Sequence, residues 1–156
     1  MPARRADPAR LLAAVNAQRA ALGHPAWSGP VSAEALGAGC VREVLAAIDA
    51  ESSPERAALR YAVEYLLGAL ADRAPGRAVE VRIPPFAAIQ CVAGPRHTRG
   101  TPPNVIETDA VTWILLATGR IPWAEAAADP RRLRASGPRA DLSAYLPLMR
   151  APAAGR

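Results

Sequence analysis

Hydrophobic positions recur every three or four residues through the first half of the chain, and every second residue in several later stretches. The first pattern is typical of amphipathic helices and the second of strands with one buried face. Three helices are predicted in the first half: one at 7–23, one from Ser32, and one from Ser52, where Glu55 completes a capping box. Pro75-Gly76 ends the third helix and marks the sharpest change of pattern.

The second half is predicted to alternate short strands with helices. The expected elements are strands at 79–83, 87–92 and 105–108, a helix capped by Thr108 or Asp109 and ending at Gly119, a short helix from Trp123, a strand at 132–136, and a closing apolar helix or turn at 141–149. The connection at 94–104 exceeds the roughly 2–5 residues usual in a hairpin, which indicates a further role for it.

The change at Pro75-Gly76 predicts a helical region at 1–76 and an α/β domain at 77–150. Residues 151–156 are predicted to form a disordered tail, because their composition offers nothing to bury. At 51% hydrophobic and only 4% aromatic, the chain can bury a sizeable core that is rich in small alanine side chains.

Charge and hydropathy limit the partners and the location. No apolar run approaches the roughly 20 residues that span a bilayer, and no signal peptide is visible, so we expect a cytoplasmic protein without an integral membrane segment. All 19 basic residues are arginines, and the net charge is +5. Because these arginines are interspersed with acids, they predict a solvated surface of mixed charge rather than a nucleic-acid interface.

Several short motifs follow one another in a recognisable order. They are Thr108-Asp109 before Trp113, Gly119-Arg120 at a helix end, Trp123, and Ser136-Gly137 at a strand end. With the order of elements over 77–149, they resemble the bacterial sterol-carrier-like families of actinobacteria. The resemblance implies an α/β (α+β) fold: a mostly antiparallel sheet of about five strands covered on one face by helices, here with an N-terminal extension of three helices. It also implies an apolar cavity between sheet and helices, often closed by the C-terminal segment.

The same module occurs in proteins similar to mycothiol-dependent maleylpyruvate isomerase, where an N-terminal four-helix bundle supplies histidines for a metal. This chain departs from that pattern, since it predicts only three N-terminal helices and contains only His24 and His97. A zinc site needs about three converging protein ligands. Cys40 and Cys91 match no metal motif, and we expect buried thiols, with a disulfide as the alternative. No metal and no cofactor is predicted.

Five apolar residues are the predicted lining of the ligand cavity: Phe86, Ile89, Trp113, Leu116 and Leu146. Ordinary core packing is the alternative for each, because a carrier's pocket is built from the same residue types as a core.

The loop that contains Arg96, His97 and Arg99 is the polar cluster nearest to this predicted cavity. Three interpretations stay open: an exposed loop shaped by prolines, an anion site built on charge-assisted hydrogen bonds, and an acid–base pair of His97 with Glu107.

The functional prediction is noncatalytic binding or carriage of an apolar or amphipathic small molecule, lipid or sterol-like, in a cavity between 79–92 and 109–118. The alternative is a small isomerase or cyclase that uses the same pocket with the loop of Arg96, His97 and Arg99. A third reading is a partner-binding module in which the N-terminal helices form a homodimer; otherwise they act as a cap. No phosphate loop or nucleophile motif is present in the sequence, so no catalytic residue is assigned.

Overall fold

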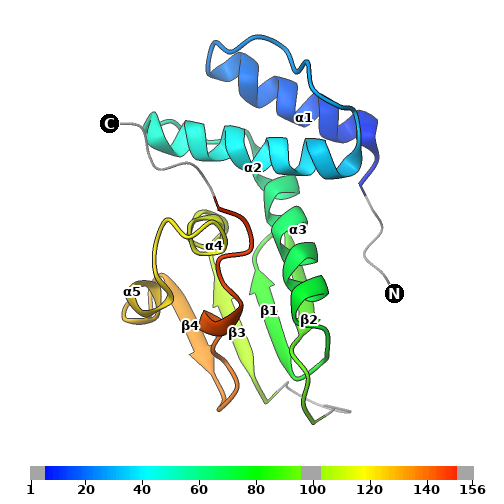
Figure 1. Cartoon of the computed structure of the whole chain (residues 1–156). Helices are drawn as coiled ribbons and strands as arrows, with labels where there is room; N and C mark the ends of the chain where they lie inside the picture. Colours follow the sequence, from blue (N-terminus) through cyan, green and yellow to red (C-terminus); the bar gives the residue numbers. More distant parts are fainter. Residues whose placement is uncertain (1–5, 96–102, 151–156) are drawn as a thin grey trace. The chain divides into compact units, whose positions relative to one another are not determined.

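The structure is a computed structural model, and it describes residues 6–95 and 103–150 (Figure 1). The chain divides into two compact units, one up to Tyr65 and one from Leu66 onward. The division falls within helix α3 (Arg56–Arg73). These units do not test the domain boundary predicted after residue 76, which stays a prediction.

The first unit contains α1 (Pro8–Ala21), α2 (Ala33–Asp49) and the first part of α3. Both predicted helix starts are confirmed by side-chain caps. The carboxylate of Asp7 accepts a hydrogen bond from the Ala9 amide at 3.0 Å, and the hydroxyl of Ser32 accepts one from the Ala35 amide at 3.1 Å. These side chains satisfy amides that have no partner inside the helix. The helices α1 and α2 pack along one another (Figure 1).

The segment between α1 and α2 is held to the helices by Trp27. The Trp27 amide donates to the side-chain oxygen of Asn16 at 2.7 Å, and the indole nitrogen donates to the Pro30 carbonyl at 3.2 Å. The ring packs so closely on Gly39 of α2 that a Cβ there would lie 2.7 Å from it. The guanidinium of Arg42 lies 5.8 Å from the ring centroid, within the range of a cation–π contact.

The start of α3 differs from the prediction. The expected capping box required the Glu55 amide to donate to the Ser52 side chain. Instead, that amide donates to the side-chain oxygen of Gln18 in α1 at 2.7 Å, and α3 begins at Arg56. Gln18 is fully buried. The Gln18 side chain of α1 therefore accepts the hydrogen bond from the Glu55 amide that the Ser52 side chain was expected to accept.

The second unit is built on a four-stranded sheet, formed by β1 (Val79–Ile83), β2 (Ala87–Cys91), β3 (Val105–Thr108) and β4 (Leu133–Ser136). The order is β2-β1-β3-β4; β1 is antiparallel to β2 but parallel to β3, and β3 is antiparallel to β4. The strand positions are confirmed to within a residue or so. The described residues form four strands rather than about five, and the central pair is parallel.

This strand order explains the length of the connection at 92–104. β2 and β3 lie on opposite sides of β1. The chain must therefore pass the end of β1 and cover two strand spacings, about 10 Å, before it enters the sheet again. A tight hairpin turn cannot do this.

The two faces of the sheet differ in character. On one face, Val81 of β1 lies opposite Ile89 of β2 and Ile106 of β3, and the β1 residues on this face are buried. The helix α4 (Ala110–Ala117) and the end of α3 lie on this side (Figure 1). The other face carries a row of charged residues in register, Arg82, Glu107 and Arg134. The helices thus cover the apolar face.

The remaining elements are short. The predicted helix at Trp123 is α5 (Trp123–Ala127), which contacts α4 and β4. Residues 141–149 form one turn of 3₁₀ helix, η1 (Ser143–Tyr145), within an otherwise irregular segment. The tail at 151–156 lies outside the described residues. No helix in the described ranges is long and apolar enough to cross a bilayer.

Candidate functional site

The helix α4 presents Trp113 at the centre of its inward face. Its two half-buried residues are Val111 and Leu115. At about 100° per residue, each lies about 160° from Trp113 around the helix axis, so Trp113 points directly away from the outer side. Ile114 and Ala117, beside it on the wheel, are fully buried. The helix α4 covers the apolar face of the sheet (Figure 1). Because Trp113 lies on the buried side of α4 and is 1% exposed, it belongs to the interior of this unit.

Asp109 sets the start of α4. One carboxylate oxygen accepts a hydrogen bond from the Thr112 amide at 2.9 Å, and the other accepts from the Thr112 hydroxyl at 2.6 Å. Of the two caps predicted, Thr108 and Asp109, it is therefore Asp109 that caps the helix. This cap places Trp113 one turn further along, where its amide donates to the Asp109 carbonyl at 2.9 Å.

The predicted cavity residues are found in two environments. Trp113 and Leu116 are buried in the interior, with 1% and 2% of their surface exposed. Phe86, Ile89 and Leu146 are half-buried, in the turn after β1, in β2 and after η1 respectively. Ile89 shares the covered face of the sheet with Val81. Whether they line a cavity or simply form core stays a prediction.

The polar loop lies outside what the structure describes. Arg96, His97 and Arg99 belong to the undescribed range 96–102. Its proposed partner Glu107 is half-buried on the open face of the sheet, opposite Arg134. The anion-binding and acid–base interpretations of the loop both stay predictions.

Buried polar side chains in the second unit are hydrogen-bonded within it. The Asn104 amide donates to the Ala78 carbonyl at 2.9 Å, and the hydroxyls of Thr108 and Thr118 donate to backbone carbonyls at 2.6 and 2.7 Å. The indole nitrogen of Trp113 is different, because it is buried and has no hydrogen-bond partner.

The C-terminal segment is attached to α3 and α4 through backbone groups. The guanidinium of Arg73, at the end of α3, donates to the carbonyls of Tyr145, Pro147 and Leu148 at 3.0, 2.6 and 3.4 Å. The amides of Leu148 and Met149 donate to the Ala117 carbonyl at 2.8 and 3.1 Å. Sequence reasoning missed Arg73, because its partners lie more than 70 residues away and no local motif marks them.

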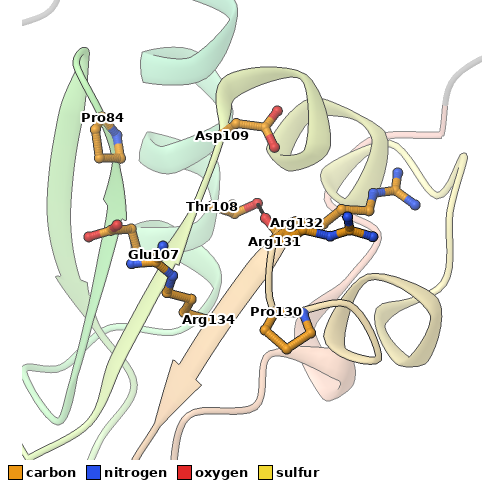
Figure 2. A pocket seen from close by; sticks show the side chains of 8 residues that line it. All are labelled: Pro84, Glu107, Thr108, Asp109, Pro130, Arg131, Arg132 and Arg134. Atoms are coloured by element: carbon orange, nitrogen blue, oxygen red, sulfur yellow. Dashed lines mark hydrogen bonds between the residues drawn. The ribbon is translucent and has the colours of Figure 1, made fainter.

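A shallow groove lies where β3 meets α4 and the loop before β4 (Figure 2). Its volume is about 200 Å³, below the roughly 300–1,000 Å³ of most small-molecule sites. Eight residues line it: Pro84, Glu107, Thr108, Asp109, Pro130, Arg131, Arg132 and Arg134. The groove is thus polar and lies beside the predicted apolar cavity rather than within it.

Most polar groups in this groove already have partners. The Asp109 oxygens cap α4, and the Thr108 hydroxyl bonds the Arg132 carbonyl. Arg131 pairs with Asp129 and Arg132 with Glu125, each at 3.4 Å. Figure 2 shows Arg134 extending toward Glu107, while Arg131 and Arg132 extend to the opposite side. Because the guanidiniums diverge, the groove is better explained as a junction of loops than as an anion site.

The first unit holds a buried carboxylate that the sequence did not indicate. Glu43 of α2 is 8% exposed; it accepts a hydrogen bond from the Arg19 guanidinium and lies 2.9 Å from Nδ1 of His24. Arg19 also donates from Nε to the Pro25 carbonyl at 2.6 Å. His24 was predicted to be a linker residue, and it is, but with its ring directed to α2. The pairing fastens the linker to both helices.

Both cysteines are free and buried, so the thiol alternative is confirmed and the disulfide is wrong. Burial raises the pKa of Cys40 to about 12, with a further contribution from Glu43, and burial raises the pKa of Cys91 to about 11. Neither thiol is a nucleophile at neutral pH, because the thiolate is the reactive form.

Comparison with known proteins gives one family. The model of the family described as "Bacterial SCP ortholog" matches residues 55–148, more than half of the chain. The match includes the whole of α3 and so extends further toward the N-terminus than the predicted resemblance at 77–149. No curated protein matches the sequence.

Proposed function

Because the chain belongs to this bacterial sterol carrier protein-like family, we propose that it binds and carries an apolar or amphipathic small molecule between the sheet and α4. The observation that carries the proposal is the inward face of α4. Trp113, Ile114 and Ala117 direct a wholly buried surface toward the apolar face of the sheet. Such a layer contains the hydrophobic and aromatic lining that small-molecule sites use.

The chemistry of the second unit supports an apolar ligand over a polar one. The groove on its surface is small, and Asp109, Arg131 and Arg132 there are engaged in a helix cap and ion pairs. The covered face of the sheet carries Val81, Ile83 and Ile106, all without charge. Transfer of a ligand's apolar surface onto such a face gains about 25 cal/mol per Å².

Ile89 provides a test of where the ligand lies. It occupies the covered face of β2, while its neighbour Ala88 points to the open face and is exposed. We expect Ile89→Asp to weaken binding of a fluorescent fatty-acid analogue by about tenfold or more, because the variant places a carboxylate beside the apolar ligand. Ala88→Asp adds the same charge one residue away, and it should bind the analogue as the wild type does.

The measurement is a fluorescence titration, with native mass spectrometry of the purified protein for copurified lipid. Circular dichroism confirms that both variants are folded. The proposal fails if the wild-type protein neither copurifies with a lipid nor binds the analogue. If both variants bind the analogue equally weakly, the ligand does not bind against the covered face of the sheet. The alternative enzymatic function depends on residues outside the described ranges, and no second function is proposed.

A further inference from the structure

The indole N–H of Trp113 is one of the few buried side-chain groups in the described residues that have no hydrogen-bond partner. The buried polar side chains around it in sequence, Thr108, Thr112 and Thr118, all have hydrogen-bond partners. Trp113 is 1% exposed, and its Nε1–H has no acceptor. Buried tryptophan usually finds a partner for this group. A donor left without one is unfavourable for folding, so it calls for an explanation.

The direction of the side chain shows where a missing acceptor would lie. Trp113 projects from the side of α4 opposite Val111 and Leu115, into the layer between this helix and the sheet. This is the layer in which the ligand is proposed to bind. Ile114 of the same helix and Ile106 on the covered face of the sheet are also buried, and neither side chain has a hydrogen-bonding group.

An ordered water molecule at this position would need polar partners besides the indole. A buried water typically makes about three hydrogen bonds, and it is stable only where 2–4 polar groups surround it. The hydroxyls of Thr108, Thr112 and Thr118 already donate to Asp109 or to backbone carbonyls, so they offer a water no further donor. An oxygen atom that belongs to an apolar ligand needs only the one donor, because the rest of the ligand is satisfied by apolar contact.

We propose that the Trp113 indole N–H is the specificity-determining donor of this site, and that it selects apolar molecules with a hydrogen-bond acceptor oxygen over pure hydrocarbons. The ligand class is therefore an apolar molecule with a carbonyl, ether, ester or hydroxyl oxygen in its buried part. The inference rests on the proposed function, because it assumes that a ligand enters the layer between α4 and the sheet.

The first experiment observes the donor directly in the wild-type protein. In a ¹⁵N-labelled sample, the indole signals of Trp27, Trp113 and Trp123 are assigned from spectra of Trp→Phe variants. Addition of 2-dodecanone should shift the Trp113 indole proton downfield, as expected when a hydrogen bond forms. Dodecane, which has the same chain without the oxygen, should perturb the signal without this downfield shift.

The second experiment compares affinities of the same two probes. Trp113→Phe removes the donor but keeps an aromatic ring, so it should weaken 2-dodecanone binding about 3- to 10-fold more than it weakens dodecane binding. Trp123→Phe is the matched control, because Trp123 begins α5 and leaves the donor in place. The ratio of the two affinities is the readout, since loss of ring area affects both probes alike.

The outcomes separate this inference from the proposed function. If neither probe nor the fatty-acid analogue binds the wild-type protein, the proposed function fails. If both probes bind, and Trp113→Phe weakens them equally, the donor role is overturned while the carrier function stands. If Trp113→Phe does not fold, the downfield shift in the wild-type spectrum decides, and its absence with bound ketone would contradict the inference.

Discussion

At the scale of single residues, several buried polar side chains in the described ranges bond partners far away in sequence. Gln18 bonds the Glu55 amide, Asn104 bonds the Ala78 carbonyl and accepts from the Arg139 amide, and Glu43 contacts Arg19 and His24. A buried charge is costly unless it is paired and hydrogen-bonded. Such residues therefore have more influence on stability than their small number suggests.

Glu43 gives a prediction at this scale. Glu43→Gln leaves the Arg19 guanidinium without its carboxylate, at a side chain that is only 20% exposed. We expect the free energy of unfolding to fall by about 2 kcal/mol, less than the roughly 3–5 kcal/mol lost when a fully buried pair is broken. Urea unfolding followed by circular dichroism measures this. Glu51→Gln, at an exposed position, is the control and should change stability little; an equal effect of both would argue against the pairing.

At the scale of elements, local signals predicted most helices and strands, whereas their attachments arise from tertiary contacts. The caps of α1, α2 and α4 were visible in sequence because a cap and its amide lie two or three residues apart. The irregular segment after η1 has no such signal. This segment lies against α3 and α4 because its carbonyls accept hydrogen bonds from Arg73 and its amides donate to the Ala117 carbonyl.

Arg73 gives the prediction for this segment. Arg73→Ala removes three hydrogen bonds to backbone carbonyls of residues 145–148. The Leu148 and Met149 amides should then exchange with deuterium about 5- to 10-fold faster, as expected when local opening becomes about 1 kcal/mol easier. Exchange in α1 and α2 should not change. Arg77→Ala, which removes a bond to the Gln90 side chain instead, is the matched control; if it accelerates the same amides, Arg73 has no special role.

At the scale of the whole molecule, three buried or half-buried groups titrate in the same direction at alkaline pH. The pKa of Cys40 is raised to about 12 and that of Cys91 to about 11, both mainly by burial. Burial, with a hydrogen bond to Glu34, raises the pKa of Tyr65 to about 12. Each group stays protonated in the folded state at a pH where the unfolded chain has already lost the proton.

The contribution of these three groups to stability should therefore be constant below about pH 8.5 and fall as the pH rises above the unfolded cysteine value of 9.0. Between pH 8 and pH 10.5, the free energy of unfolding should fall by about 2 kcal/mol for each cysteine, and the titration of Tyr65 lowers it further. Urea unfolding at the two pH values measures this. In the double variant Cys40→Ala/Cys91→Ala, the loss of unfolding free energy between pH 8 and pH 10.5 should be smaller by about 3–4 kcal/mol. If the loss is unchanged, the thiols are not its source.

The sequence by itself determined the kind and position of nearly every element, the apolar face of the strand at 79–83, and the family resemblance. Periodicity, caps and turn residues are local, so neighbours in the chain suffice to produce them. Tertiary structure alone decided the strand order with its parallel central pair, the start of α3 at Arg56, and the attachment of residues 145–148 by Arg73. These features depend on groups that meet only after folding, because their partners lie tens of residues apart.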